Sequence, residues 1–324
     1  MYEQTCMKSV DVICAGIVVA DHICTPISHV PRAGELVLAD GMTLASGGCA
    51  ANTAVDLVKF NVSTHIVGRV GDDLFGNLVI EMLQDQGIET SGLLRTTGID
   101  TSQTLIINVK NEDRRFVHTF GANAEFRTAD IPRESVAQCK ILYVGGYLLM
   151  PAFEQDGLVE LFEFARSHHV KTVLDVGIPR PESYLERLEK VLPYTDVFLP
   201  NTDEASIILG IEDARKQAIK FHALGAATVV ITRGEFGSVL VNSKVRLEAG
   251  VFRMPYVDGS GSGDAFDAGY IIGLLRGWDE EGCLALASAL GASCVRAIGT
   301  TAGVFTALEC NDFLQKNQLK IERW

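Results

Sequence analysis

Three segments decide the fold: Ile141-Leu-Tyr-Val-Gly-Gly-Tyr147, Lys171-Thr-Val-Leu-Asp-Val-Gly177 and Ala227-Thr-Val-Val-Ile-Thr-Arg-Gly234. Each is a short apolar run rich in strand-forming residues, and longer amphipathic stretches such as 157–169 and 214–225 lie between them. Strands that alternate with helices are typical of β-α-β units, whose parallel strands are covered by helices on both faces. The pattern predicts a three-layer α/β/α sandwich with a mostly parallel central sheet.

The first 130 residues have a different pattern. Residues 39–46 and 101–121 look like antiparallel strands with one face exposed to water, the second with a turn at Asn111-Glu112-Asp113. Between them we expect a helix from about Ala50, a strand over 64–71 and a helix over 75–87. We therefore expect one domain over residues 1–324, its sheet beginning at Val10, with a small β-sheet lid formed by insertions at about 20–45 and 98–123.

Composition describes a globular chain and excludes some partners. The 324 residues are 47% hydrophobic and 21% charged, with a formal net charge of −13. A nucleic-acid-binding protein normally carries a basic face, so this acidic balance argues against nucleic acid. It also implies that a cation is needed wherever a polyphosphate binds.

The N-terminal region predicts neither a membrane span nor a secretory leader. Its longest apolar run, 12–20, is far shorter than the roughly 20 residues that span a bilayer. The chain starts Met-Tyr-Glu-Gln, without a basic leader. The eight cysteines form no C-x-x-C pair, as expected of free buried thiols. We expect a cytoplasmic protein without a membrane partner.

The segment Asp258-Gly-Ser-Gly-Ser-Gly-Asp264-Ala-Phe-Asp-Ala-Gly269 carries the chemistry. Its small residues predict a loop whose backbone N–H groups point inward, followed by a helix from about Ser262; such a helix N-terminus binds anions. Asp264 is then a candidate base beside a transferring phosphate. Taken alone, a capping aspartate after a glycine-rich turn explains the segment equally well. The loop lacks the G-K-[ST] ending of a Walker A motif.

This segment resembles the C-terminal signature of the ribokinase-like sugar kinases, the PfkB family. Residues 46–54 (SGGCAANTA) with 67–76 (VGRVGDDLFG) are similar to that family's N-terminal signature. Asp21 follows the first strand, where the family keeps a sugar-binding aspartate. Residues 201–204 match an N-x-x-E motif, and residues 232–237 match a T-x-G-x-x-G turn. The five elements occur in the family's order.

The resemblance implies an ATP-dependent, Mg²⁺-dependent kinase of a small sugar. Asp264 would be the general base, with the amides of Gly261, Ser262 and Gly263 as the anion hole. The sugar would contact Asp21, Gly47, Gly48 and Asn52, and His118 and Asn123 of the lid are further candidates. The nucleotide and metal side would comprise Asn201, Glu204, Thr232, Gly234, Gly237 and Arg180, with Asn201 and Glu204 holding Mg²⁺ through water. Some members bind a monovalent cation such as K⁺ through carbonyls that correspond to Asp258, Ser260 and residues 296–303.

Several departures bear on the substrate. Cys49 and Ala50 follow the glycine pair where true ribokinases have Gly-Lys-Gly, and 145–153 lacks their sugar-binding glutamate, which disfavours ribose. Gly259 replaces the usual Thr, Ser, Pro or Val. A nucleoside kinase is the alternative within the family, and a non-catalytic sugar or nucleotide sensor is the alternative of another class. Because lids in this family often pair between subunits, we also expect a homodimer.

Overall fold

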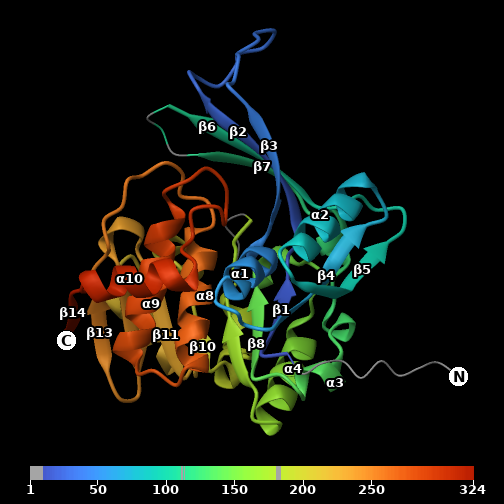
Figure 1. Cartoon of the computed structure of the whole chain (residues 1–324). Helices are drawn as coiled ribbons and strands as arrows, with labels where there is room; N and C mark the ends of the chain where they lie inside the picture. The colour runs from blue at the N-terminus through green and yellow to red at the C-terminus, as the bar shows by residue number, and fades with distance from the viewer. Residues whose placement is uncertain (1–9, 111, 113, 180–183) are drawn as a thin grey trace, which may run out of the picture.

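A computed structural model gives the structure of the protein and describes residues 10–110, 112, 114–179 and 184–324. Its centre is a ten-stranded sheet in the order β14-β13-β12-β11-β10-β9-β8-β1-β4-β5 (Figure 1). In this order, each strand from β11 across to β5 is parallel to the next. At the other edge, each strand from β11 through β12 and β13 to β14 is antiparallel to the next. The strands are β1 Val12–Gly16, β4 Thr64–Gly71, β5 Glu89–Thr96, β8 Ile141–Gly145, β9 Lys171–Leu174, β10 Val197–Phe198, β11 Thr228–Thr232, β12 Ser238–Asn242, β13 Arg246–Ala249 and β14 Ile321–Arg323.

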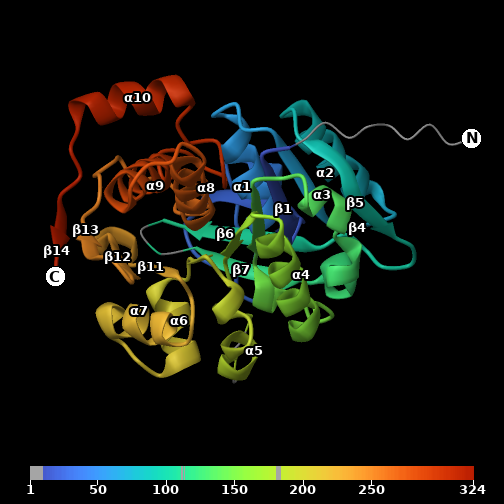
Figure 2. The same ribbon diagram turned by 90° about the horizontal axis from the view of Figure 1, so that it is seen from below.

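Helices cover both faces of this sheet, as Figure 2 shows. Alternate residues of β1 face opposite layers: Val12 packs with one set of helices and Ile13 with the other. The first layer contains α1 Cys49–Val58, α2 Leu74–Asp85, α8 Ser262–Leu275, α9 Glu280–Cys294 and α10 Ala307–Lys316. The second contains α3 Arg133–Val136, α4 Gln155–Ser167, α5 Leu185–Glu189, α6 Thr202–Leu209 and α7 Ala214–Ala223. The predicted α/β/α sandwich is confirmed.

A separate four-stranded sheet, β3-β2-β6-β7, stands at one end of the sandwich (Figure 1). We call it the lid; its strands are β2 Val19–Ile27, β3 Met42–Gly47, β6 Gln103–Val109 and β7 Arg115–Thr119. The pairs β2-β3 and β6-β7 are antiparallel, as the sequence predicts for each piece. The two pieces are joined by a parallel pair, β2-β6, which the sequence pattern did not indicate.

Element boundaries follow the sequence pattern closely. The first strand of the main sheet begins at Val12, two residues later than expected, and α8 begins at Ser262 as expected.

None of the helices in the described ranges is both long and apolar enough to cross a bilayer.

Candidate active site

The loop before α8 is shaped by its own residues. Asp258 is buried, and its Oδ1 accepts hydrogen bonds from the amide and the hydroxyl of Ser260 at 3.0 and 2.9 Å. Gly261 has φ 78°, and a Cβ there would lie 2.0 Å from the carbonyl oxygen of Thr300. Only glycine fits this position without displacing backbone.

The N-terminus of α8 is open. Gly261 is its N-cap and supplies no capping side chain. Gly263 is exposed, and a Cβ on it would meet nothing within 4 Å. Amide groups at a helix start that lack a capping partner attract an anion, because the helix dipole adds to their partial charge. The loop and helix start can therefore hold a phosphate group.

Asp264 lies in the first turn of α8 and is held from α1. The side-chain amide of Asn52 donates to Oδ2 of Asp264 at 2.7 Å. Burial raises the pKa of Asp264, and the hydrogen bond from Asn52 opposes that rise. Oδ1 of Asn52 is buried and has no hydrogen-bond partner within the described part of the chain.

Asp21 lies on β2 and is 4% exposed. Burial raises its pKa to about 7, and a hydrogen bond with Thr104 opposes that rise. A Cβ on Gly47 would lie 1.8 Å from Oδ2 of Asp21, so Gly47 makes room for this carboxylate. Gly48 has φ 93°, and a Cβ there would lie 2.5 Å from the carbonyl oxygen of Ile17. The glycine pair thus lets the start of α1 lie close to β2.

One cavity of about 860 Å³ unites most of the predicted acceptor-side residues. Its lining includes Asp21, Gly48, Asn52, Ser260, Gly261 and Asp264. The lid contributes His118, whose Nδ1 lies 2.9 Å from the hydroxyl of Thr104. The structure therefore brings a candidate base, an anion-binding helix start and a buried carboxylate to one space, beneath a sheet that can cover it.

Other predicted residues lie elsewhere. Asn123 was expected to contact the substrate, but it is fully buried. Its side-chain N–H donates to the carbonyl of Val18 at 3.0 Å, and its Oδ1 accepts from the amide of Val18 at 3.2 Å. Both polar ends of this buried asparagine are satisfied on neighbouring backbone, so neither is left for a substrate. Arg180 lies outside the described residues.

The predicted nucleotide side is separate from this cavity. Asn201 and Glu204 form a capping box at the start of α6: the Asn201 side chain accepts from the Glu204 amide, and Glu204 accepts from the Asn201 amide, both at 2.9 Å. Thr232 ends β11 next to Asn201, and Gly234 and Gly237 follow in a turn with φ 54° and 82°. None of these five residues lines the cavity that contains Asp264.

Buried carboxyl groups connect the two sides. Burial raises the pKa of Asp175 to about 8, and the charge of Asp264 adds to the shift. Burial also raises the pKa of Glu204 well above its usual range, with Asp175 as the next cause. One ligand atom each of Cys49, Asp175 and Asp264 lies within 4.8 Å of the others. Carboxylates that raise one another's pKa suit a divalent cation, which would remove this repulsion.

Protein groups engage several carbonyls that correspond to the monovalent-cation site of some family members. The thiol of Cys294 lies 3.1 Å from the carbonyl oxygen of Ser260 and 3.2 Å from that of Thr300. The guanidinium of Arg296 donates to the carbonyl of Gly303 at 2.7 Å. The ammonium of Lys59 donates to the carbonyl of Thr301 and to the buried Asp56.

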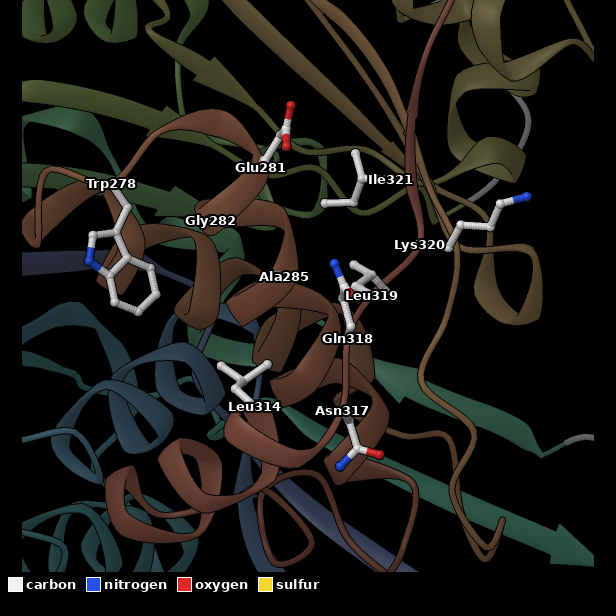
Figure 3. Close-up of a pocket in the computed structure, with 10 residues that line it drawn as sticks. All are labelled: Trp278, Glu281, Gly282, Ala285, Leu314, Asn317, Gln318, Leu319, Lys320 and Ile321. Carbon is white, nitrogen blue, oxygen red and sulfur yellow. The ribbon is translucent and has the colours of Figure 1, made fainter.

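A second cavity, of about 650 Å³, lies between α9 and the chain that leads to β14 (Figure 3). Trp278, Glu281 and Leu314 line it together with residues 317–321. It contains none of the predicted site residues, so it has no part in the candidate site.

Sequence reasoning missed several residues of the main cavity. Arg114, Phe116, His118 and Phe120 all line it, although only His118 was expected. These positions alternate along and beside β7, and residues two apart in a strand face the same side. The two-residue spacing from His118 was therefore the sequence signal that could have placed Arg114, Phe116 and Phe120 on the cavity side of the strand.

Comparisons with known proteins find relatives that match most of the chain. The family model described as pfkB family carbohydrate kinase matches residues 9–307. A ribokinase of Haemophilus influenzae is 28% identical over 307 residues, which cover 93% of this chain and 97% of the relative.

Three solved structures share the fold. A ribokinase of Arabidopsis thaliana complexed with ribose and ATP has a TM-score of 0.79 at 23% identity, covering 95% of this chain and 99% of the other. A putative ribokinase II of E. coli in complex with ATP and Mg²⁺ has a TM-score of 0.83 at 20% identity, covering 95% of this chain and 100% of the other. A nucleoside kinase of Methanocaldococcus jannaschii has a TM-score of 0.78 at 21% identity, covering 96% of this chain and 99% of the other.

Proposed function

This chain belongs to the pfkB family of carbohydrate kinases, and we propose that it moves the γ-phosphate of ATP to a hydroxyl of a small free sugar. The observation that carries the proposal is the position of Asp264. Its carboxylate is fixed by Asn52 at the open start of α8 and faces the same cavity as Asp21. A base, an anion-binding helix start and a polyol-binding carboxylate are the parts that such a transfer requires.

In the proposed mechanism, Asp264 accepts the proton of the attacking hydroxyl. The raised pKa of Asp264 makes it a stronger base once it is ionised. The side-chain amide of Asn52 keeps the carboxylate of Asp264 in place. The amides of Gly261, Ser262 and Gly263 stabilise negative charge on the phosphoryl oxygens. Asp21 accepts hydrogen bonds from further hydroxyls, with His118 at the lid side.

On the nucleotide side, we propose that Thr232, Gly234 and Gly237 contact ATP, with Arg180 as a phosphate contact. Glu204 and Asn201 would hold Mg²⁺ through water, since their capping box engages one Glu204 oxygen and leaves the other available. Bound there, Mg²⁺ would neutralise charge on the β- and γ-phosphates. The raised pKa of Glu204 and the nearby charge of Asp175 support a cation at this place.

A nucleoside kinase is the second candidate, and one observation favours it. Phe116, Phe120 and His118 place three aromatic rings along one face of the cavity, and a nucleobase can stack on such rings. A non-catalytic sensor would have no use for a fixed base at the anion site.

An ATP-consumption screen tests these alternatives. Purified protein is assayed with Mg·ATP and pentoses, hexoses, sugar acids, sugar phosphates or nucleosides, beside an Asp264→Asn variant. We expect one class of acceptor to stimulate ADP formation at least about 100-fold over that variant. If no acceptor exceeds the Asp264→Asn rate, the kinase proposal is wrong and the sensor alternative gains support.

We also propose that the chain acts as one domain with its lid and forms a homodimer through the lid. Leu36 and Leu38 are 80% and 83% exposed, and Met42 and Val117 on the lid strands are 68% and 61% exposed. A second copy could bury such a patch. Light scattering should give twice the chain mass, and Met42→Glu with Val117→Glu should give the monomer mass.

A further inference from the structure

We infer that Arg114, next to the lid strand β7, binds the phosphoryl group during transfer, and that Gly259 is glycine in order to seat its guanidinium. This inference rests on the proposed kinase function and adds a residue from the lid to the anion site formed by the loop before α8.

The lid strand aims Arg114 into the cavity. Arg114 lines the cavity together with Phe116, His118 and Phe120, two, four and six residues further along. The intervening Arg115 lies outside that lining and pairs with Glu112. The Cζ atom of Arg114 lies 5.5 Å from the centre of the Phe116 ring, close enough for a cation-π contact that helps to fix the guanidinium.

The guanidinium lies against the anion-binding loop. A Cβ placed on Gly259 would lie 2.9 Å from Nη1 of Arg114 and 3.5 Å from Cζ. A side chain at position 259 would therefore push the guanidinium, which ends a flexible side chain, away from the loop. Gly259 has no left-handed backbone that would demand glycine, since its φ lies outside the positive range. Arg114 therefore lies at the contact that a side chain at this position would disturb most.

The position of Arg114 suits a phosphate. Gly259 lies two residues before Gly261, the N-cap of α8, so the guanidinium packs on the same loop whose amides would hold phosphoryl oxygens. Asp264 and Ser260 line the same cavity. A guanidinium donates two parallel hydrogen bonds to phosphate and keeps its charge throughout the reaction, so it transfers no proton. In a chain with a net charge of −13, a guanidinium beside this loop supplies positive charge where an anionic ligand would bind.

Nucleotide binding tests the inference without knowledge of the sugar. Titration calorimetry compares Mg·ATP with Mg·ADP for the wild type and for Arg114→Ala. Because only ATP carries the γ-phosphate, we expect Arg114→Ala to lower the affinity for Mg·ATP about 10-fold and the affinity for Mg·ADP less than about 2-fold. Equal effects on the two nucleotides, or no effect, would overturn the inference. Arg115→Ala is the matched control, since it removes the same charge one residue away, and it should leave both affinities unchanged.

A double-mutant cycle tests the role of Gly259. Gly259→Ala should displace the guanidinium and weaken the binding of Mg·ATP as Arg114→Ala does. Added to Arg114→Ala, it should lower the affinity for Mg·ATP by less than about a further 2-fold. Additive losses would contradict the pairing. The added methyl would also lie 3.2 Å from the hydroxyl of Tyr256. The variant Gly259→Ala with Tyr256→Phe removes that contact, and we expect the same loss from it.

Turnover separates this inference from the proposed function. With the best acceptor of the screen, Arg114→Ala should lower kcat about 100-fold, and Arg114→Lys should recover part of that loss. If the wild type has no turnover with any acceptor, the proposed kinase function fails, while the comparison of Mg·ATP with Mg·ADP still decides the role of Arg114.

Discussion

The amide of Asn52 in α1 holds the carboxylate of Asp264 in α8 at 2.7 Å, across 212 residues of sequence. Asn52 is 4% exposed, and a neutral donor of this kind lowers the pKa of a carboxyl that burial raises. The pair therefore sets both the direction of the candidate base and the pH at which it is ionised.

Replacing Asn52 with Ala should impair catalysis and shift its pH dependence. Loss of the donor raises the pKa of Asp264, so the acidic limb of the kcat profile should move to higher pH. We expect kcat near neutral pH to fall about 10- to 100-fold, as for the loss of a hydrogen bond to a charged group. Thr53→Ser, which keeps a hydroxyl beside Asp264, is the control. An unchanged limb would mean that Asn52 does not tune the base.

Asp21 should make acceptor binding dependent on pH. Its pKa lies at about 7, so it is protonated below and ionised above that pH. Because an ionised carboxylate accepts hydroxyl bonds from both oxygens, kcat/KM for the acceptor should fall as the pH is lowered through about 7. Asp21→Asn should raise the acceptor KM at least about 10-fold and leave the KM for Mg·ATP unchanged. A larger effect on the nucleotide would place Asp21 outside the acceptor site.

Burial of Asp175 should lower stability as the pH rises. The pKa of this carboxyl is 3.8 as a reference value and about 8 in the fold. Between these pH values the folded chain holds a proton that the unfolded chain has lost, so the free energy of unfolding falls with increasing pH. Asp175→Asn removes this term and should stabilise the protein by about 1–2 kcal/mol near pH 8, with less effect near pH 5. Urea unfolding at both pH values measures it. A destabilised variant at the higher pH would show that ionised Asp175 is already compensated in the fold.

The hydrophobic pattern predicted the alternating strands and helices because the period of each element can be read from a few neighbouring residues. The run from residue 140 to 234 alternates strands and helices, and β8 to β11 with α4, α6 and α7 follow it closely. The antiparallel edge β12 to β14 was not anticipated. β14 pairs with β13 from more than 70 residues away, and a three-residue strand gives no periodic signal.

Residue chemistry and motif together selected Asp21, Asn52 and Asp264, and the structure places all three around one cavity, while their roles stay predictions. Asn123 was misassigned because only the tertiary structure shows that it bonds the backbone of Val18. Arg114 was missed because the charged run 112–115 is typical of a solvated turn. Its role depends on Gly259, which lies 145 residues away and carries no side chain that could have indicated it.

Lys59 should make the loop beside α8 independent of added monovalent cations. Its ammonium joins buried Asp56 to the carbonyl of Thr301, next to Thr300, whose backbone packs on Gly261. Together with Cys294 and Arg296, it engages carbonyls that correspond to the monovalent-cation site of some family members. Replacing K⁺ by tetramethylammonium should therefore change kcat less than about 2-fold, since donors of the protein already engage several of these oxygens.

Lys59→Met should lower kcat and make it respond to K⁺, because a small cation can then take the place of the ammonium beside Asp56. The control is Lys316→Met, which removes an exposed lysine that pairs with Asp312 on α10. Steady-state rates in K⁺ and tetramethylammonium buffers of equal ionic strength measure both effects. A wild type that loses most of its activity without K⁺ would show that the loop needs an external cation, and that Lys59 only ties α1 to it.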